Sequence, residues 1–285
     1  MSARPSVRTL LVLGRISNLP TVWTNCLCGW LLGGGGSELT LLLLLCGSSL
    51  VYVGGMFLND AFDAAFDRQY RRERPIPSQQ IGEALVWEIG GALLAGGGLM
   101  LGFLGWTTAI FSGLLLLSVL AYDAIHKAFK FSPVIMAACR FFLLLAAASA
   151  GDEGVTGTAA WTAFALSGWI LGLSYVARRE SAAGPLRWWP LLALASPLVL
   201  AGFLNDGVYR LRMLILAALL LTWMVLCLRH CFAGAQRQLG RTVAGLLAGI
   251  CLVDLLAVPP EPAAHVACLL GFLLALLAQR FIPAT

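Results

Sequence analysis

One stretch decides how the chain is organised: Asn59-Asp60-Ala61-Phe62-Asp63-Ala64-Ala65-Phe66-Asp67, at the end of an apolar run. On a helix with ~3.6 residues per turn, Asn59, Asp63 and Asp67 recur on one face, with Asp60 about 100° away. Carboxylates on one face of a polar cavity are typical of a site for Mg²⁺, which keeps some waters and takes substrate phosphate as a further ligand. The alternative is a helix end that places solvated charges at a membrane surface.

An arginine-rich segment follows this acidic stretch and leads into Pro75-Ile76-Pro77-Ser78. Guanidinium groups bind phosphate oxygens through two parallel hydrogen bonds. We therefore expect Arg68, Arg72 and Arg74, with Asn59, to bind phosphate oxygens whose negative charge the metal does not neutralise.

The composition excludes an ordinary soluble domain. Of the 285 residues, 59% are hydrophobic and 12% are charged, whereas soluble domains have roughly 45–50% and about 25%. Apolar runs of about 20 residues recur along the chain, each long enough to cross a bilayer as a helix. The eight cysteines lie in or beside these runs, where a thiol behaves as a small hydrophobe, so we predict no disulfide and no cysteine-bound metal.

The predicted class is an all-α polytopic membrane protein with one helical bundle domain over residues 1–285. The expected apolar stretches cover about 15–32, 39–58, 82–104, 107–125, 133–150, 158–177, 188–204, 211–228, 243–258 and 264–281. Residues 61–82 are expected to form a polar connection. No soluble domain is predicted, and no nucleic-acid partner.

The placement of basic residues predicts the orientation of the bundle. With a cytoplasmic N-terminus, most of the 19 lysines and arginines fall on the cytoplasmic side, and Arg210 and Arg212 fall on the other. Positive residues favour the cytoplasmic side of a membrane protein. We therefore expect an integral protein of the cell inner membrane, with the acidic stretch on its cytoplasmic side.

Polar side chains inside the apolar runs mark a second set of candidates. Asn18 and Asn25 lie in the first run, and Arg140 lies in the fifth. Uncompensated polar groups in lipid are unfavourable, so they are expected to face the bundle interior, where they line a site or bond between helices. Snorkelling toward the membrane surface is the alternative for Arg140. Asp254, in the ninth run, is expected to be hydrogen-bonded for structural reasons.

The chain resembles the UbiA superfamily of intramembrane prenyltransferases from about residue 10 to 260. Its acidic stretch matches that family's Asn-Asp/Gln-x-x-Asp-x-x-x-Asp motif, and Arg74-Pro75-Ile76-Pro77-Ser78 matches the sequence that often follows. Tyr122 and Lys127 are similar to a tyrosine and a lysine that recur at the end of the fourth helix. The opening Gly14-Arg15-Ile16-Ser17-Asn18-Leu19-Pro20 resembles the EboC-like branch.

The resemblance implies about nine to ten spans around a central cavity that opens toward lipid. It implies transfer of an isoprenoid group, an alkyl group other than methyl, from a prenyl diphosphate bound through Mg²⁺. The implied metal ligands are Asn59, Asp60, Asp63 and Asp67, and the implied catalytic residues are Asp63, Asp67, Tyr122 and Lys127. For the acceptor we predict contacts from Asn18, Asn25, His126 and Arg140.

One motif departs from the family pattern. Family members usually carry a second aspartate cluster after the sixth helix, whereas this chain reads Leu173-Ser174-Tyr175-Val176-Ala177-Arg178-Arg179-Glu180-Ser181. Two arginines stand where acids are expected. We predict that Arg178 and Arg179 bind the diphosphate, that Glu180 is a further metal ligand, and that one Mg²⁺ is required rather than two.

Two other functions fit the same residues. A non-catalytic lipid-binding or transport protein would keep the cavity, and a terpene-cyclase-like lyase would use water or no acceptor. The acceptor stays open among an aromatic acid, a quinone precursor, a tetrapyrrole and a polyol, as do the prenyl chain length and the oligomeric state.

Overall fold

The computed structural model describes residues 5–178, 188–204, 210–232 and 238–284, and all regular structure in these ranges is helical. The elements, in chain order, are α1 (Val7–Leu13), the 3₁₀ helix η1 (Ile16–Asn18), α2 (Leu19–Leu32), α3 (Glu38–Tyr70), α4 (Glu83–Gly102), α5 (Trp106–Ile125), α6 (Ser132–Ser149), α7 (Gly157–Ala177), α8 (Trp189–Leu194), α9 (Ser196–Leu204), α10 (Arg210–Phe232), α11 (Leu239–Ala248), α12 (Ile250–Ala257) and α13 (Pro262–Ala278). The predicted all-α class is confirmed.

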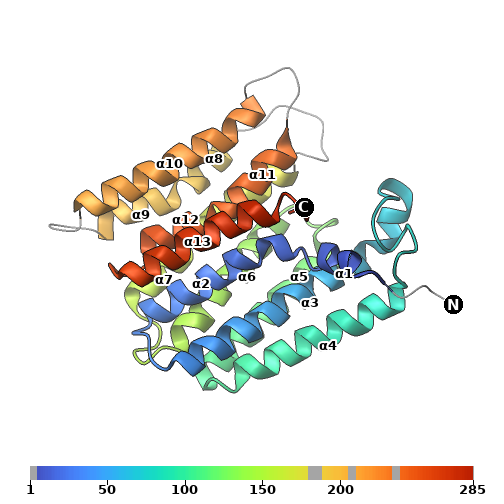
Figure 1. Ribbon diagram of the computed structural model, residues 1–285, viewed down its shortest axis with the longest axis horizontal. Helices are drawn as coiled ribbons and strands as arrows, with labels where there is room; N and C mark the ends of the chain where they lie inside the picture. Colours follow the sequence, from blue (N-terminus) through green and yellow to red (C-terminus); the bar gives the residue numbers. More distant parts are fainter. Residues whose placement is uncertain (1–4, 179–187, 205–209, 233–237, 285) are drawn as a thin grey trace.

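The helices lie side by side in one bundle (Figure 1). Helices α3, α4 and α5 form one edge, α9 and α10 form the other, and α2, α6, α7 and α12 lie between them. The ends of α3, α5 and α7 that carry polar residues point toward the same end of the bundle as α1. This common direction brings residues far apart in the sequence to one site.

Seven helices in the described part of the chain are long and apolar enough to cross a membrane. They are α3, α4, α5, α6, α7, α10 and the continuous pair α11–α12. The span count differs from the predicted nine to ten because α2, α8–α9 and α13 are shorter; α13, for example, has 17 residues. At ~1.5 Å per residue a helix of that length covers about 26 Å, slightly less than the ~30 Å hydrocarbon core.

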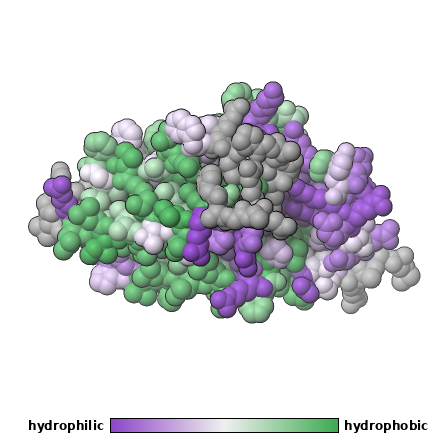
Figure 2. Space-filling view, turned by 90° about the horizontal axis from the view of Figure 1, so that it is seen from above, coloured by the Kyte–Doolittle hydropathy of each residue, from purple (hydrophilic) through white to green (hydrophobic). Residues whose placement is uncertain are grey.

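The surface agrees with a lipid environment. Apolar side chains cover much of the face in Figure 2, and hydrophilic side chains gather at the end where Figure 1 places α1 and the N-terminus. Large apolar residues such as Phe103, Leu117 and Phe203 are more than 60% exposed. In a soluble protein such patches would promote association, but in a bilayer they contact acyl chains.

Helix α3 continues further than the sequence predicted. Residues 61–70 are helical rather than part of a polar connection, and α3 has 33 residues. At ~1.5 Å per residue it is about 50 Å long, so its last turns extend past the hydrocarbon core. The helix continues because its acidic side chains find basic partners, whereas its aromatic residues Phe62 and Phe66 lie on another, exposed face.

Glycines fix the position of α3 against α4. A Cβ on Gly54 would lie 2.7 Å from the backbone nitrogen of Leu94, and a Cβ on Gly97 would lie 2.6 Å from the carbonyl oxygen of Gly47. Both separations are shorter than real Cβ contacts, so only glycine allows the two backbones to approach this closely. The close packing fixes the rotation of α3 about its own axis, and therefore the direction in which the acidic stretch faces.

Candidate active site

The acidic stretch occupies the last turns of α3 and is buried despite its charge. Asn59, Asp60 and Asp63 are each 6% exposed and Asp67 is 1% exposed. Their spacing of about one turn stacks Asn59, Asp63 and Asp67 along one face, as the sequence predicted. Buried carboxylates require partners, and the structure supplies basic ones.

Basic side chains from three segments reach these carboxylates. Arg74 Nη1 lies 2.9 Å from Asp60 Oδ1, and its Nε lies 3.9 Å from Asp67 Oδ2. Lys127 Nζ lies 2.7 Å from Asp63 Oδ1. These contacts place Arg74 and Lys127 beside the acidic stretch, and their predicted roles in diphosphate binding and catalysis stay predictions.

His126 is the second basic partner of Asp63. Its Nε2 lies 3.5 Å from Asp63 Oδ1, and its Nδ1 lies 3.1 Å from the carbonyl oxygen of Tyr122. Burial opposes a charge on the imidazole, but the hydrogen bond to Asp63 and its negative charge outweigh burial and raise the pKa of His126 above 6.5. His126 was predicted to bind the acceptor, whereas here it contacts the acidic stretch and also lines the cavity.

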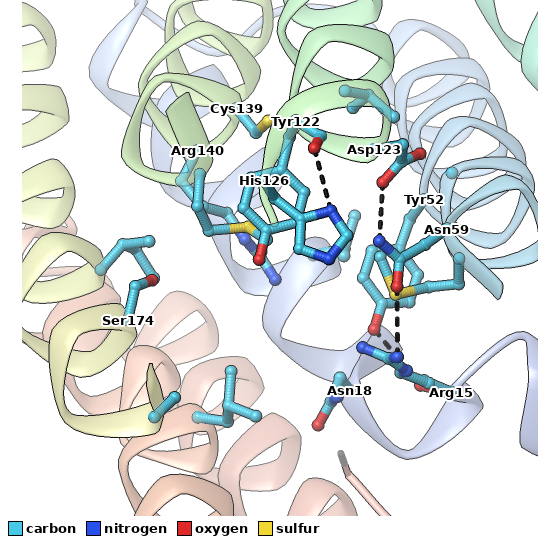
Figure 3. A pocket seen from close by; sticks show the side chains of 18 of the residues that line it. Arg15, Asn18, Tyr52, Asn59, Tyr122, Asp123, His126, Cys139, Arg140 and Ser174 are labelled. Carbon is cyan, nitrogen blue, oxygen red and sulfur yellow. Dashed lines mark hydrogen bonds between the residues drawn. The ribbon is translucent and has the colours of Figure 1, made fainter. Parts of the chain in front are cut away.

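A cavity of about 340 Å³ lies beside this face of α3, and Figure 3 shows the side chains that line it. Its volume is within the range of small-molecule sites. Its polar residues are Arg15, Asn18, Tyr52, Asn59, Asp63, Arg71, Arg74, Tyr122, Asp123, His126, Arg140 and Arg178 among others. Its apolar wall includes Val22, Val51, Leu115, Leu143, Ile170 and Leu173. The cavity therefore joins a charged end to an apolar wall.

Arg15 and Asp123 were missed as site residues in the sequence. Arg15 Nη2 lies 3.4 Å from Asn59 Oδ1 and 3.5 Å from Asp60 Oδ1. Asp123 Oδ1 accepts a hydrogen bond from Asn59 Nδ2 at 2.9 Å. The sequence did contain a signal for both, because Arg15 is three residues before Asn18 and Asp123 follows Tyr122 directly.

Tyr52 and Arg71 also line the cavity, although neither was predicted there. Tyr52 Oη donates to the carbonyl oxygen of Arg15 at 3.4 Å, next to an Arg15 backbone with φ of 43°. A left-handed backbone is unusual for a residue with a side chain, and here it accompanies the turn of Arg15 toward α3.

Arg140 lines the cavity from the middle of α6 and is anchored to α2. Its Nη1 donates to Asn25 Oδ1 at 2.6 Å and to the carbonyl oxygen of Thr21 at 3.1 Å. Asn25 Nδ2 in turn donates to both carboxylate oxygens of Asp254, at 2.8 and 2.7 Å. The structural role expected for Asp254 agrees with these bonds, and snorkelling of Arg140 does not.

The predicted acceptor contact of Asn25 does not fit its position. Asn25 is 0% exposed and lies behind Arg140 rather than on the cavity wall, because both ends of its amide bond to charged residues of other helices. Asn18 does line the cavity, with its Nδ2 donating to the carbonyl oxygen of Ala284 at 2.9 Å.

Two of the predicted arginines point away from the site. Arg68 pairs with Glu83 and both side chains are substantially exposed, and Arg72 is exposed as well. On the helix, Arg68 follows Asp67 directly and so lies on a different face. Neither residue lines the cavity, so their predicted diphosphate contacts are not supported by this geometry.

Arg178 lines the cavity at the end of α7 and donates to the carbonyl oxygen of Lys130. Asp63 lines the same cavity, and the predicted contact of Arg178 with the diphosphate stays a prediction. The predictions for Arg179 and Glu180 fall outside the described residues.

The chemistry of the acidic stretch suits Mg²⁺, although its ligands are not gathered around one point. Within the described ranges, no three histidine, cysteine or acidic side chains already form a metal-binding group. Asp67 Oδ1, however, is buried with no hydrogen-bond partner among the described residues. Carboxylate and amide oxygens are the ligands that Mg²⁺ prefers. The set fits the ion if Arg74 and Lys127 exchange their carboxylate contacts for contacts with phosphate.

The family model of the UbiA prenyltransferases matches residues 19–253 of the chain. The match includes the acidic stretch, Tyr122, Lys127 and Arg140. No branch within the family is distinguished by it, so the EboC-like placement stays a prediction. No curated protein matches the chain.

Two solved structures share the fold. A structure of digeranylgeranylglyceryl phosphate synthase in membranes is 19% identical, with a TM-score of 0.62 over 93% of this chain and 98% of that chain. An apo UbiA homolog from Aeropyrum pernix K1 is 16% identical, with a TM-score of 0.51 over 95% of this chain and 97% of that chain. At these identities the likeness shows a common fold.

Proposed function

Because the chain belongs to the UbiA prenyltransferase family, we propose that it transfers a prenyl group from a prenyl diphosphate to a small or lipid-like acceptor, with Mg²⁺ as cofactor. One observation carries the proposal: Asn59 and Asp63 of the acidic stretch, together with Arg74 and His126, line the same cavity as a wall of apolar side chains. A prenyl diphosphate has the same division, because a charged head is attached to a hydrocarbon chain.

The acidic stretch is proposed to hold the metal through Asn59, Asp60, Asp63 and Asp67. When bound there, Mg²⁺ neutralises part of the diphosphate charge and stabilises it as a leaving group. Asp67 offers an oxygen that has no partner in the described part of the chain. The remaining carboxylate oxygens become available as their basic partners move to phosphate.

Basic side chains are proposed to bind the phosphate oxygens directly. Arg74 and Lys127 already lie within 2.9 Å of the acidic stretch, and Arg71 and Arg178 line the same cavity. Positive groups fixed before the reaction stabilise charge that develops on the leaving group. Arg178 occupies the place where a second aspartate cluster is missing, which supports a requirement for one Mg²⁺.

The apolar wall is proposed to protect the allylic carbocation that remains after the diphosphate departs. Leu115, Leu143, Ile170 and Leu173 line the cavity and exclude water, which would otherwise capture the cation. The acceptor is proposed to enter near Tyr122 and Arg140, which also line the cavity. The protein is integral to the membrane, and we place the acidic stretch on the cytoplasmic side because the basic residues gather there.

One observation favours a second function. Asp60 and Asp63 are already paired with basic residues, so their charge is balanced without a metal. A lipid-binding or transport protein is therefore the alternative, and a lyase that uses water is a third possibility for the same cavity.

Diphosphate release separates these functions. The purified protein in lipid nanodiscs is given prenyl diphosphates of increasing chain length, with a panel of phenolic, quinonoid, tetrapyrrole and polyol acceptors. We expect diphosphate release that requires Mg²⁺ and a product whose mass is the acceptor plus one prenyl group. Binding of a prenyl diphosphate without release of diphosphate would support the lipid-binding alternative. Release of diphosphate together with a free terpene alcohol or hydrocarbon would support the lyase.

A further inference from the structure

A fourth carboxylate lies in the cavity region, on a different helix from the acidic stretch. Asp123 comes from α5, is 4% exposed and lines the cavity. Its Oδ1 accepts from Asn59 Nδ2 at 2.9 Å, and its Oδ2 is buried with no hydrogen-bond partner among the described residues. The proposed function gives it no role.

The amide of Asn59 is oriented from both of its ends (Figure 3). An amide nitrogen only donates and an amide oxygen only accepts, while a carboxylate accepts and a guanidinium donates. Asp123 therefore selects the nitrogen end, and Arg15 Nη2 at 3.4 Å selects the oxygen end. A flipped amide would set oxygen against carboxylate and nitrogen against guanidinium. The orientation of Asn59 is thus determined by its neighbours.

Asp123 differs from the other carboxylates of the site because no described basic residue lies within ion-pair distance of it. Asp60, Asp63 and Asp67 each have an ion pair within 4 Å, whereas no ion pair joins Asp123 to a described residue. Among the described residues, its carboxylate forms a side-chain hydrogen bond with the amide of Asn59 alone. A charged acceptor on the N–H side of an amide polarises the group and makes its oxygen a better ligand.

We infer that Asp123 is the positioning residue for Asn59: it holds Nδ2 so that Oδ1 stays available as a metal ligand, and it increases the electron density on that oxygen. This rests on the proposed Mg²⁺ site. It assigns Asp123 no contact with metal or substrate. Arg15 Nη2 donates a long hydrogen bond to Oδ1 at 3.4 Å, and a metal bound by Oδ1 would take the place of that bond.

The chain contains a matched control for this pair. Asp254 also accepts hydrogen bonds from an asparagine amide, that of Asn25, and is 0% exposed. That pair lies behind Arg140 and does not line the cavity. Asp254→Asn therefore removes an equivalent buried carboxylate–amide bond without touching the acidic stretch.

The test measures metal binding rather than turnover. Mn²⁺ replaces Mg²⁺, inorganic diphosphate replaces the prenyl donor, and bound Mn²⁺ is measured by electron paramagnetic resonance on protein in nanodiscs. Asp123→Asn is expected to weaken Mn²⁺ binding about 10- to 100-fold, as loss of a residue that orients a metal ligand does. Asp254→Asn is expected to leave Mn²⁺ affinity within about twofold of wild type. Thermal unfolding of each variant shows whether it is folded.

An exchange of the two side chains tests the pairing itself. In Asn59→Asp with Asp123→Asn, the new amide at 123 donates to the new carboxylate at 59. We expect Mn²⁺ affinity to recover most of the loss, which a general packing defect at Asp123 would not allow. If Asp123→Asn does not fold, Asp123→Glu takes its place, because it keeps the charge and displaces the carboxylate by one methylene.

The outcomes separate this inference from the proposed function. Wild-type protein that binds no Mn²⁺ in the presence of diphosphate would contradict the metal-dependent function. Tight Mn²⁺ binding by wild type and by a folded Asp123→Asn or Asp123→Glu variant alike would overturn the role of Asp123 and leave the proposed function standing. An equal loss in Asp254→Asn would overturn it as well, since the effect would not be specific to Asn59.

Discussion

Lys127 Nζ lies 2.7 Å from Asp63 Oδ1, and the same ammonium lies 3.9 Å from the ring centre of Phe66. An ammonium over an aromatic face is held there by the ring's charge distribution. Lys127, which follows α5, is therefore fixed on α3 by two contacts. It pairs with the Asp63 carboxylate, and under the proposed function it would exchange that carboxylate for a phosphate oxygen.

Asp63→Asn and Asp67→Asn should each abolish turnover while the bundle stays folded, because both carboxylates are proposed to bind the metal; Asp63 lines the cavity, and Asp67 lies one turn further along the same face of α3. Diphosphate release would be measured beside thermal unfolding. Glu83→Gln, on the exposed pair with Arg68, is the control and should keep its activity. Near wild-type turnover in either aspartate variant would contradict the metal assignment.

Arg74→Gln should weaken use of the prenyl diphosphate much more than Arg68→Gln. The Arg74 side chain is 19% exposed and lies against Asp60, whereas that of Arg68 is 53% exposed and pairs with Glu83. Loss of a charge-assisted phosphate contact is expected to lower kcat/KM by about 10- to 150-fold, or ~1.5–3 kcal/mol. An equal loss of kcat/KM in the two variants would contradict a phosphate contact made by Arg74 and not by Arg68.

Arg178→Gln should lower kcat/KM by about 30- to 150-fold, or ~2–3 kcal/mol, if Arg178 supplies charge in place of the second aspartate cluster. Arg72→Gln, at an exposed position that does not line the cavity, is the control. A single Mn²⁺ bound per protein would agree with this role. If Arg178→Gln keeps full activity, Arg178 serves only as a membrane-side anchor.

The ion pair of His126 should make stability depend on pH. The folded-state pKa of His126 is raised above 6.5, so its contribution is complete below the unfolded-state pKa and is lost as pH rises through the folded-state pKa. Unfolding temperatures of wild type and His126→Gln should therefore differ most below pH ~6.5 and converge at higher pH. A difference that grows with pH would contradict this pairing.

Arg140→Leu should raise the KM of the acceptor more than that of the prenyl diphosphate, because Arg140 lies on the cavity wall apart from the acidic stretch. Its bonds to Thr21 and Asn25 use part of its hydrogen-bonding capacity, and a guanidinium has five N–H donors in all. Arg140→Lys keeps the positive charge and should therefore raise the KM of the acceptor less than Arg140→Leu does. Equal changes in both KM values would indicate a purely structural role.

Much of the fold was predictable because the relevant information is local in the sequence. Apolar runs set the helices, and the spacing of Asn59, Asp63 and Asp67 placed them on one face. The spacing argument treats the acidic stretch as helical, yet residues 61–82 were expected to form a polar connection, and the structure continues α3 through these polar residues to Tyr70. The acidic residues remain helical here because basic residues outside α3, such as Arg74 and Lys127, neutralise Asp60 and Asp63.

Tertiary structure alone decided which polar residues meet. Asn59 and Asp123 are 64 residues apart, and Asn25 and Asp254 are 229 apart, so no spacing rule could pair them. The rotation of each helix about its axis depends on packing, as at the glycine contacts of α3 with α4. The rotation of α3 left Arg68 on its exposed face, and the connection after α3 folds back so that Arg74 reaches Asp60. The sequence by itself therefore determined the helical membrane bundle and its acidic face, and packing between distant helices determined the partners of that face.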